Sequence, residues 1–282
     1  MVLLIQSMNV AFSLPGNIPI YAFPLLVGLG ATFGLAWVAF QAPPKELRLR
    51  IDAGLWALLG ALLGSRISFV LVNSAYYREN PWEALAIYQG GLSWPGAMAG
   101  GVLALLMAAR LLRTPTGKLA DAMLPLVASV AVSAWMACWQ TGCAYGPPAD
   151  HIWGIPAIDE WGQLAPRWPT QLIGAMLALA LFWVLDRSRS WPTIPRWAKN
   201  HGNPAALGVL GLSLELLALS FLRADPAVAW RGLRLDAWAA LAIVAFTTLF
   251  LIWSALRWVH NSEQWEKGQG IRDWLFSLIA NY

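Results

Sequence analysis

Long apolar runs, separated by short polar stretches, recur along the whole chain. A helix needs about 20 mainly apolar residues to cross the hydrocarbon core of a bilayer. Seven runs reach or approach this length, and the fifth of them is the shortest. They cover Pro19–Phe40, Ile51–Val72, Trp94–Leu112, Leu119–Trp139, Thr170–Leu185, Ala205–Leu222 and Asp236–Leu256. The pattern predicts an all-α polytopic membrane protein with seven transmembrane helices.

The basic residues between these runs predict the orientation of the chain. If the N-terminus lies outside, most of the 19 Lys and Arg residues fall on the cytoplasmic side, while Arg66 lies inside the second run. Loops rich in Lys and Arg tend to stay in the cytoplasm. We therefore expect the N-terminus outside and the C-terminus in the cytoplasm, which requires an odd number of spans.

The end of the chain is too polar to span. We divide the sequence into a seven-helix transmembrane domain over residues 1–258 and a cytoplasmic tail over residues 259–282. Apolar residues of the tail fall on one helical face, at Ile271, Trp274, Leu275, Leu278 and Ile279. We expect an amphipathic helix that lies on the inner leaflet or docks on a partner subunit.

Composition agrees with a membrane protein and excludes other classes. The chain is 58% hydrophobic and 12% charged, whereas soluble domains carry about 25% charged residues. The basic residues behind the net charge of +4 follow the loop topology, so we expect no nucleic-acid partner. The histidines lie outside the predicted spans and two cysteines are too few for the usual zinc site, so we expect neither a metal nor a cofactor.

Two ionisable residues lie at membrane depth, where such groups are costly and rare. Arg66 falls in the outer half of the second run, and Glu215 near the middle of the sixth. Each is either a functional group or a buried structural contact. For Arg66 a lipid phosphate is an equally natural partner, because guanidinium groups bind phosphate well.

Five short motifs follow one another along the chain. They are GSR at Gly64–Arg66, YQGGLSWPGAMAGG at Tyr88–Gly101, WMACWQTGCAYG at Trp135–Gly146, RWPTQL at Arg167–Leu172 and SFLRADP at Ser220–Pro226. Together they resemble the prolipoprotein diacylglyceryl transferases, whose motifs read GAR, GGLSFHGGLLGG, RxGNFxNxExxG, RHPTQLYE and EFFREPD. The resemblance covers most of the chain. It implies the seven-span fold of that family in a bacterial inner (plasma) membrane.

The resemblance also implies a reaction and a partner. The family moves a diacylglyceryl group from phosphatidylglycerol to the thiol of a lipobox cysteine on the outer face. We therefore expect a phospholipid similar to phosphatidylglycerol as partner. The positions that the resemblance assigns to lipid or phosphate binding are Arg66, Gly90, Gly91, Thr141, Gly142, Gly146, Gln171 and Arg223.

Most residues that would carry the chemistry differ from the family pattern. The family histidine, which would act as a base, is replaced by Pro95. We call Trp135–Gly146, which corresponds to RxGNFxNxExxG, the signature stretch, and the arginine that opens this motif is replaced by Trp135. Further positions of the family's polar residues hold Cys138, Cys143, Trp168, Gly174, Leu216 and Ser220. From the sequence we identify no catalytic residue. It favours a catalytically degenerate member that acts as a lipid-binding accessory or structural subunit of a membrane complex. The alternative is an active, diverged transferase in lipoprotein maturation.

The two cysteines, Cys138 and Cys143, lie near the predicted outer surface, where disulfides are permitted. Three interpretations stay open at this point: two small buried residues in a turn, a disulfide across that turn, or a metal or reactive-thiol pair. The last has no acid or histidine beside it in the sequence.

Overall fold

The computed structural model describes residues 10–14, 18–87, 90–188 and 190–280. The α-helices are α1 Ala22–Phe40, α2 Leu47–Val72, α3 Ser74–Glu79, α4 Trp94–Leu111, α5 Thr116–Ala122, α6 Leu124–Thr141, α7 Thr170–Ser188, α8 Asn203–Ser220 and α9 Leu235–Ala280. The 3-10 helices whose bounds fall within the described residues include η1 Pro81–Leu85 and η3 Arg196–Lys199. Short antiparallel hairpins pair β1 Val10–Leu14 with β2 Ile18–Tyr21, β3 Ile155–Ile158 with β4 Leu164–Arg167, and β5 Ala229–Trp230 with β6 Leu233–Arg234.

Within the described residues, 7 helices are long and apolar enough to cross a membrane. They are α1, α2, α4, α6, α7, α8 and the part of α9 that runs from Leu235 to His260. The protein is therefore a multi-pass membrane protein of the all-α class, as the apolar runs predict. Helices satisfy their own backbone groups, which is why apolar runs of this length become helices in a bilayer.

Several predicted bounds differ from those of the helices by a few residues, and two of the differences have a local cause. The run Leu119–Trp139 is two helices, because α5 ends at Ala122 and α6 begins at Leu124. Pro125 stands in the first turn of α6, where its missing N–H is tolerated, but it cannot continue a preceding helix. The first span begins later than predicted, because Pro19 pairs with Ser13 between strands β2 and β1.

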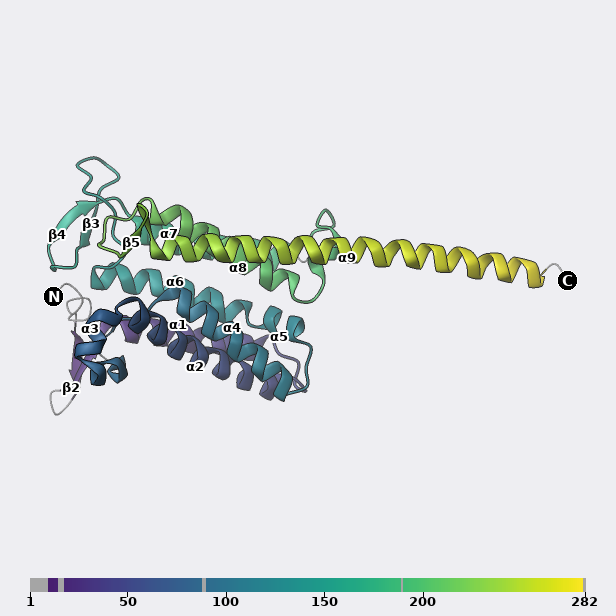
Figure 1. Ribbon diagram of the computed structural model, residues 1–282, viewed down its shortest axis with the longest axis horizontal. Coiled ribbons are helices and arrows are strands. Elements are labelled where there is room, and N and C mark those ends of the chain that lie inside the picture. The colour runs from purple at the N-terminus through teal and green to yellow at the C-terminus, as the bar shows by residue number, and fades with distance from the viewer. Residues whose placement is uncertain (1–9, 15–17, 88–89, 189, 281–282) are drawn as a thin grey trace.

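The spans pack as neighbouring pairs (Figure 1). The most extensive contacts join α2 to α4, α1 to α6 and α8 to α9, and α6 also packs on α7. The strands β3 to β6 and helix α3 gather at one end of the bundle, which we call the hairpin end. The candidate site residues of α2, α6 and α8 lie in the halves of their helices nearest this end.

Glycines allow α2 and α4 to approach each other closely. Gly60 and Gly64 of α2 face Gly96 and Gly100 of α4. A Cβ atom added to Gly64 would lie 2.3 Å from the carbonyl oxygen of Gly96, and one added to Gly100 would lie 2.1 Å from that of Gly60. The two backbones are therefore in direct contact, as in small-residue interfaces of other membrane helices.

Helix α9 is 46 residues long and continues well beyond the bundle at the end opposite the hairpins (Figure 1). It runs through the predicted domain boundary at residue 258 without a break. The predicted apolar face between Ile271 and Ile279 lies outside the residues whose side chains are described. The division into two domains and the inner-leaflet contact of the tail therefore stay predictions.

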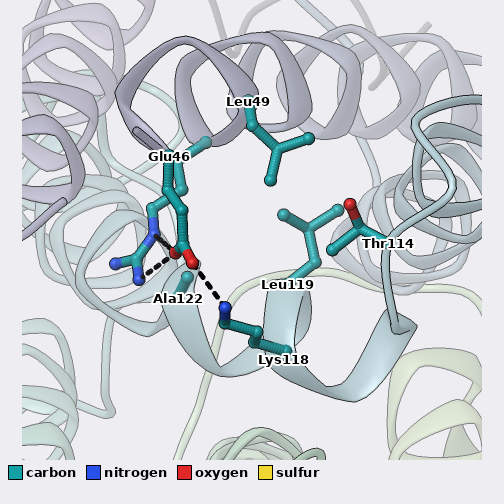
Figure 2. A pocket seen from close by; sticks show the side chains of 7 residues that line it. Glu46, Leu49, Thr114, Lys118, Leu119 and Ala122 are labelled. Carbon is teal, nitrogen blue, oxygen red and sulfur yellow. Dashed lines mark hydrogen bonds and ion pairs between the residues drawn. The ribbon is translucent and has the colours of Figure 1, made fainter. Parts of the chain in front are cut away.

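A small pocket lies at the same opposite end, between the start of α2 and helix α5 (Figure 2). Its polar lining is internally paired, because Glu46 accepts hydrogen bonds from both Arg50 and Lys118. The hydrogen bond from Lys118, followed by that from Arg50, holds the pKa of Glu46 below its ordinary value. This pocket is far from the family motifs and does not form part of the candidate site.

Candidate functional site

Arg66 occupies the hairpin end of α2, and its guanidinium group holds the segment that precedes α4. It donates to the carbonyl oxygens of Glu83 at 2.5 Å, Ala84 at 2.9 Å, Gly90 at 2.5 Å and Gly91 at 3.2 Å. Arg66 is 6% exposed. Among the described residues no carboxylate forms an ion pair with it, so its positive charge is solvated by carbonyl dipoles and is not neutralised.

Gly90 and Gly91 are kept for their backbone, which explains why both match the family. Both have a positive φ, 85° at Gly90 and 74° at Gly91, a conformation that glycine adopts without strain. At Gly91 a Cβ atom would also lie 2.5 Å from the ring of Phe69. These glycines turn the chain so that both carbonyl oxygens point at Arg66.

The signature stretch forms the end of α6 and the turn after it. Gly142 caps the helix in the left-handed conformation, with φ of 72°. Cys138 and Cys143 form a disulfide across this turn, which selects one of the three interpretations left open by the sequence. Thr141 does not point at a ligand, because its hydroxyl donates to the carbonyl oxygen of Ala137 at 2.9 Å.

The start of α7 holds the chain that follows the disulfide. The Gln171 side-chain amide donates to the carbonyl oxygen of Cys143 at 3.0 Å, and the Thr170 hydroxyl donates to that of Ala144 at 2.5 Å. Gly146 passes so close to Trp168 that an added Cβ would lie 2.4 Å from the Trp168 carbonyl oxygen. Gln171 and Gly146 thus act on the protein's own backbone.

We expect the Cys138–Cys143 disulfide to contribute modestly to stability. Replacing both cysteines with serine should lower the free energy of unfolding by about 2 kcal/mol, because the bond closes only a short loop and Gln171 and Thr170 still hold that loop. Thermal unfolding in detergent measures the change. A maleimide assay is the control: the native chain should stay unlabelled, and Cys138→Ser should expose one reactive thiol.

Trp135 and Glu215 meet inside the bundle, although 80 residues separate them in the sequence. The Trp135 indole N–H donates to Oε1 of Glu215 at 2.8 Å. The indole ring fills the space above Gly174, where an added Cβ would lie 2.3 Å from the ring. Trp135 stands at the position of the family's arginine, and Gly174 at that of a family glutamate. The two replacements therefore pack on each other.

Arg223 lies just beyond α8, and it is ion-paired. It donates to both carboxylate oxygens of Asp225, at 2.8 and 2.6 Å, and to Asp236 at 3.1 Å. Arg234 contacts the same two aspartates. Burial alone would raise the pKa of Asp225, but hydrogen bonds and charge from Arg223 and Arg234 hold it below its ordinary value. The four side chains form a closed cluster whose charges balance.

A second polar cluster around Arg167 was missed in the sequence, although its motif was recognised. Arg167 pairs with Asp159 at 3.0 Å, and its guanidinium group lies 4.6 Å from the centre of the Tyr145 ring. The Tyr145 hydroxyl donates to Glu160. Burial, and then this hydrogen bond, raise the pKa of Tyr145. The cluster links the β3–β4 hairpin to the signature turn, and the sequence signal for it was the arginine that precedes WPTQL.

The position of the family histidine offers no base. Pro95 stands in the first turn of α4, where it starts the helix. His151 lies in the loop before β3, where its ring stacks on that of Trp168 with centroids 6.2 Å apart. The described site therefore contains one cation without a carboxylate partner, Arg66, and one carboxyl group inside the bundle, Glu215.

Comparison with known proteins supplies the context for this arrangement. A family model described as prolipoprotein diacylglyceryl transferase matches residues 9–253. The chain is 29% identical over 254 residues to the phosphatidylglycerol–prolipoprotein diacylglyceryl transferase of Streptomyces griseus, which covers 85% of this chain and 74% of the relative. It is 29% identical over 258 residues to enzyme 2 of that name from Streptomyces coelicolor, covering 86% and 78%. The Synechococcus elongatus protein of that name is 28% identical over 251 residues, covering 84% of both chains.

Proposed function

The chain belongs to the prolipoprotein diacylglyceryl transferase family, and we propose that it transfers a diacylglyceryl group from phosphatidylglycerol to a cysteine thiol of a prolipoprotein. One observation carries this proposal: the family match extends over residues 9–253, so it includes helices α1 to α8, most of the spanning part of α9 and all the motif residues of the candidate site. Of the two functions expected from the sequence, the relatives support the active transferase better than the degenerate one.

Arg66 supports phospholipid as the substrate. Its guanidinium N–H groups donate to backbone carbonyl oxygens, which carry no net charge. The positive charge of Arg66 therefore stays uncompensated among the described residues. A phosphate near the headgroup region would be attracted by that charge, since arginine is the residue best suited to phosphate. Arg223 makes a weaker case, because Asp225 and Asp236 already balance its charge.

We further propose that the hairpin end faces the outside of a bacterial inner membrane, with the C-terminus in the cytoplasm. The distribution of Lys and Arg between the loops supports this orientation. It would put the signature turn, with its disulfide, on the side where thiols are oxidised and where exported lipoproteins arrive.

A second candidate function is a lipid-binding accessory or structural subunit that has lost the transfer reaction. A specific observation favours it: Pro95 and Trp135 stand at the positions of the family's base and signature arginine. Trp135 packs on Gly174, so the tryptophan at the arginine position has a structural role. In this case the chain would bind phospholipid and other subunits without turnover.

Complementation of a strain depleted of its own transferase separates the two functions. We expect expression of this chain to restore growth and to shift a reporter lipoprotein to its diacylglyceryl form, detected by mass spectrometry. The control is equal membrane accumulation of a fluorescent fusion. A chain that accumulates normally yet leaves the reporter unmodified would contradict transfer. Co-purification of a stoichiometric subunit would then support the accessory function.

A further inference from the structure

We propose that Glu215 is the general base that accepts the proton of the substrate thiol, in place of the histidine that the family motif carries. This inference rests on the proposed transferase function. A thiol attacks as the thiolate, so the reaction needs a proton acceptor near the reacting sulfur. Pro95 cannot accept a proton, and Glu215 is the carboxyl group that the described structure holds inside the bundle next to the signature helix.

The geometry gives the two oxygens of Glu215 different roles. Oε1 accepts the indole N–H of Trp135 at 2.8 Å, which fixes the direction of the carboxyl group. Oε2 is buried and has no hydrogen-bond partner among the described residues. This division, one oxygen held by an orienting donor and the other unpaired, is the arrangement expected of a positioned base.

A buried acceptor without a hydrogen bond, such as Oε2 of Glu215, lowers the stability of the fold, so its presence calls for an explanation. Leaving one unpaired costs about 1–3 kcal/mol, and native structures contain few of them. No arginine or lysine among the described residues pairs with Glu215, and the neighbours of Trp135 in its cluster are apolar. A partner that arrives only during the reaction, the substrate thiol, accounts for the free oxygen. Movement of Trp135 or of the carboxyl group would be needed to admit it.

The depth of the pair suits the reacting atoms. Glu215 lies five residues before the end of α8 at Ser220, and Trp135 six residues before the end of α6 at Thr141. At 1.5 Å per residue, both lie about 8–9 Å below the helix ends. The glyceryl carbons of a phospholipid sit at the boundary between headgroup and acyl chains. Amphipathic segments at that boundary are buried by about 5–10 Å, so the pair would reach the same level in a membrane whose surface coincides with the helix ends.

The step balances with the substrates already named. Oε2 of Glu215 takes the proton from the cysteine thiol, and the sulfur attacks the glyceryl carbon that carries the phosphate. A carbon–sulfur bond forms and the carbon–oxygen bond to phosphate breaks. Glycerol phosphate leaves with the bond's electron pair, and the proton held by Glu215 passes to it or to water. No oxidant or other reactant is needed.

The test compares Glu215→Gln with Ser213→Ala in lipid nanodiscs that contain phosphatidylglycerol. Ser213 is a suitable control because it is on the same helix, fully buried, and its hydroxyl also lacks a partner. With a lipobox cysteine peptide we expect kcat of Glu215→Gln to fall by about 10²–10⁴-fold, while KM for phosphatidylglycerol changes little. Ser213→Ala should keep the native rate.

A selenocysteine version of the peptide distinguishes a base from a structural role. A selenol is already ionised at neutral pH and does not need the base, so most of the loss in Glu215→Gln should be recovered. If that variant does not fold, Trp135→Phe replaces it, because the substitution keeps an aromatic ring but removes the hydrogen bond to Glu215. It should lower kcat for the cysteine peptide more than for the selenocysteine peptide.

Each result has one meaning. An inactive native chain would overturn the proposed function and, with it, the base. An active native chain with an equally active Glu215→Gln variant would overturn the base alone. Equal losses with sulfur and selenium would assign Glu215 a structural role and would also overturn the inference.

Discussion

Replacing Gly64 with leucine should leave almost no folded protein in the membrane. An added Cβ at Gly64 would lie 2.3 Å from the Gly96 carbonyl oxygen and 2.8 Å from the Cα atom of Gly100. Both are backbone atoms, so a rotamer change cannot relieve the contact. Helices α2 and α4 would have to separate, and the most extensive helix pair in the bundle would lose its packing. We expect a loss of more than about 4 kcal/mol.

Gly28 provides the matched control for this experiment. It is also a glycine inside a spanning helix, α1, but no described atom lies within 4 Å of the position its Cβ would take. Gly28→Leu should therefore fold like the native chain. The measurement is the fraction of monodisperse protein after detergent extraction, with thermal unfolding of what remains. Equal yields of Gly64→Leu and Gly28→Leu would contradict the close contact of α2 and α4.

The seven spans could be predicted because a bilayer imposes one requirement on every crossing segment. About 20 apolar residues in helical form are needed whatever the neighbours are. What the runs did not reveal were interruptions set by single residues. Pro125 separates α5 from α6 although the residues next to the break, Met123 and Leu124, are apolar. Hydrophobicity along the chain does not register such a break.

The site could be predicted only in part, because its chemistry depends on contacts between distant segments. The sequence singled out Arg66 as an ionisable group at membrane depth, and the residue is buried. Its bonds to four carbonyl oxygens in the Glu83–Gly91 segment follow from the fold and could not be predicted. Asp225 lies beside Arg223 in the sequence, whereas Asp236 belongs to the next span. The contact between Trp135 and Glu215 has no local signal at all.

These contacts also change what the retained motif residues mean. Gln171 and the glycines Gly90 and Gly91 match the family, yet each acts here on the protein's own backbone. A framework kept in this way keeps the shape of the hairpin end even where polar side chains have been replaced. A diverged transferase and an accessory subunit would both inherit such a framework, so the framework residues do not separate the two functions.

Replacing Arg66 with alanine should unfold the segment before α4 and abolish retention of phosphatidylglycerol. The substitution removes a donor from four carbonyl oxygens. That of Glu83 keeps the Ala86 N–H, but those of Ala84, Gly90 and Gly91 lose the donor that Arg66 supplies. Each unsatisfied buried group costs about 1–3 kcal/mol, so the total loss should exceed about 3 kcal/mol. Arg66→Lys should recover only part of it, because one ammonium group cannot reproduce the planar fork that reaches separate carbonyls.

Two measurements divide the role of Arg66 between structure and lipid binding. Limited proteolysis should show new cleavage within residues 80–91 of Arg66→Ala, and native mass spectrometry should show loss of bound phosphatidylglycerol. Arg78→Ala is the control, since Arg78 lies in α3 at the same end of the bundle but is exposed. If Arg66→Lys keeps the segment intact and still loses the lipid, the guanidinium group itself binds phosphate. If Arg66→Lys keeps both, a positive charge held among the carbonyl oxygens is sufficient, because the ammonium group supplies that charge without the fork.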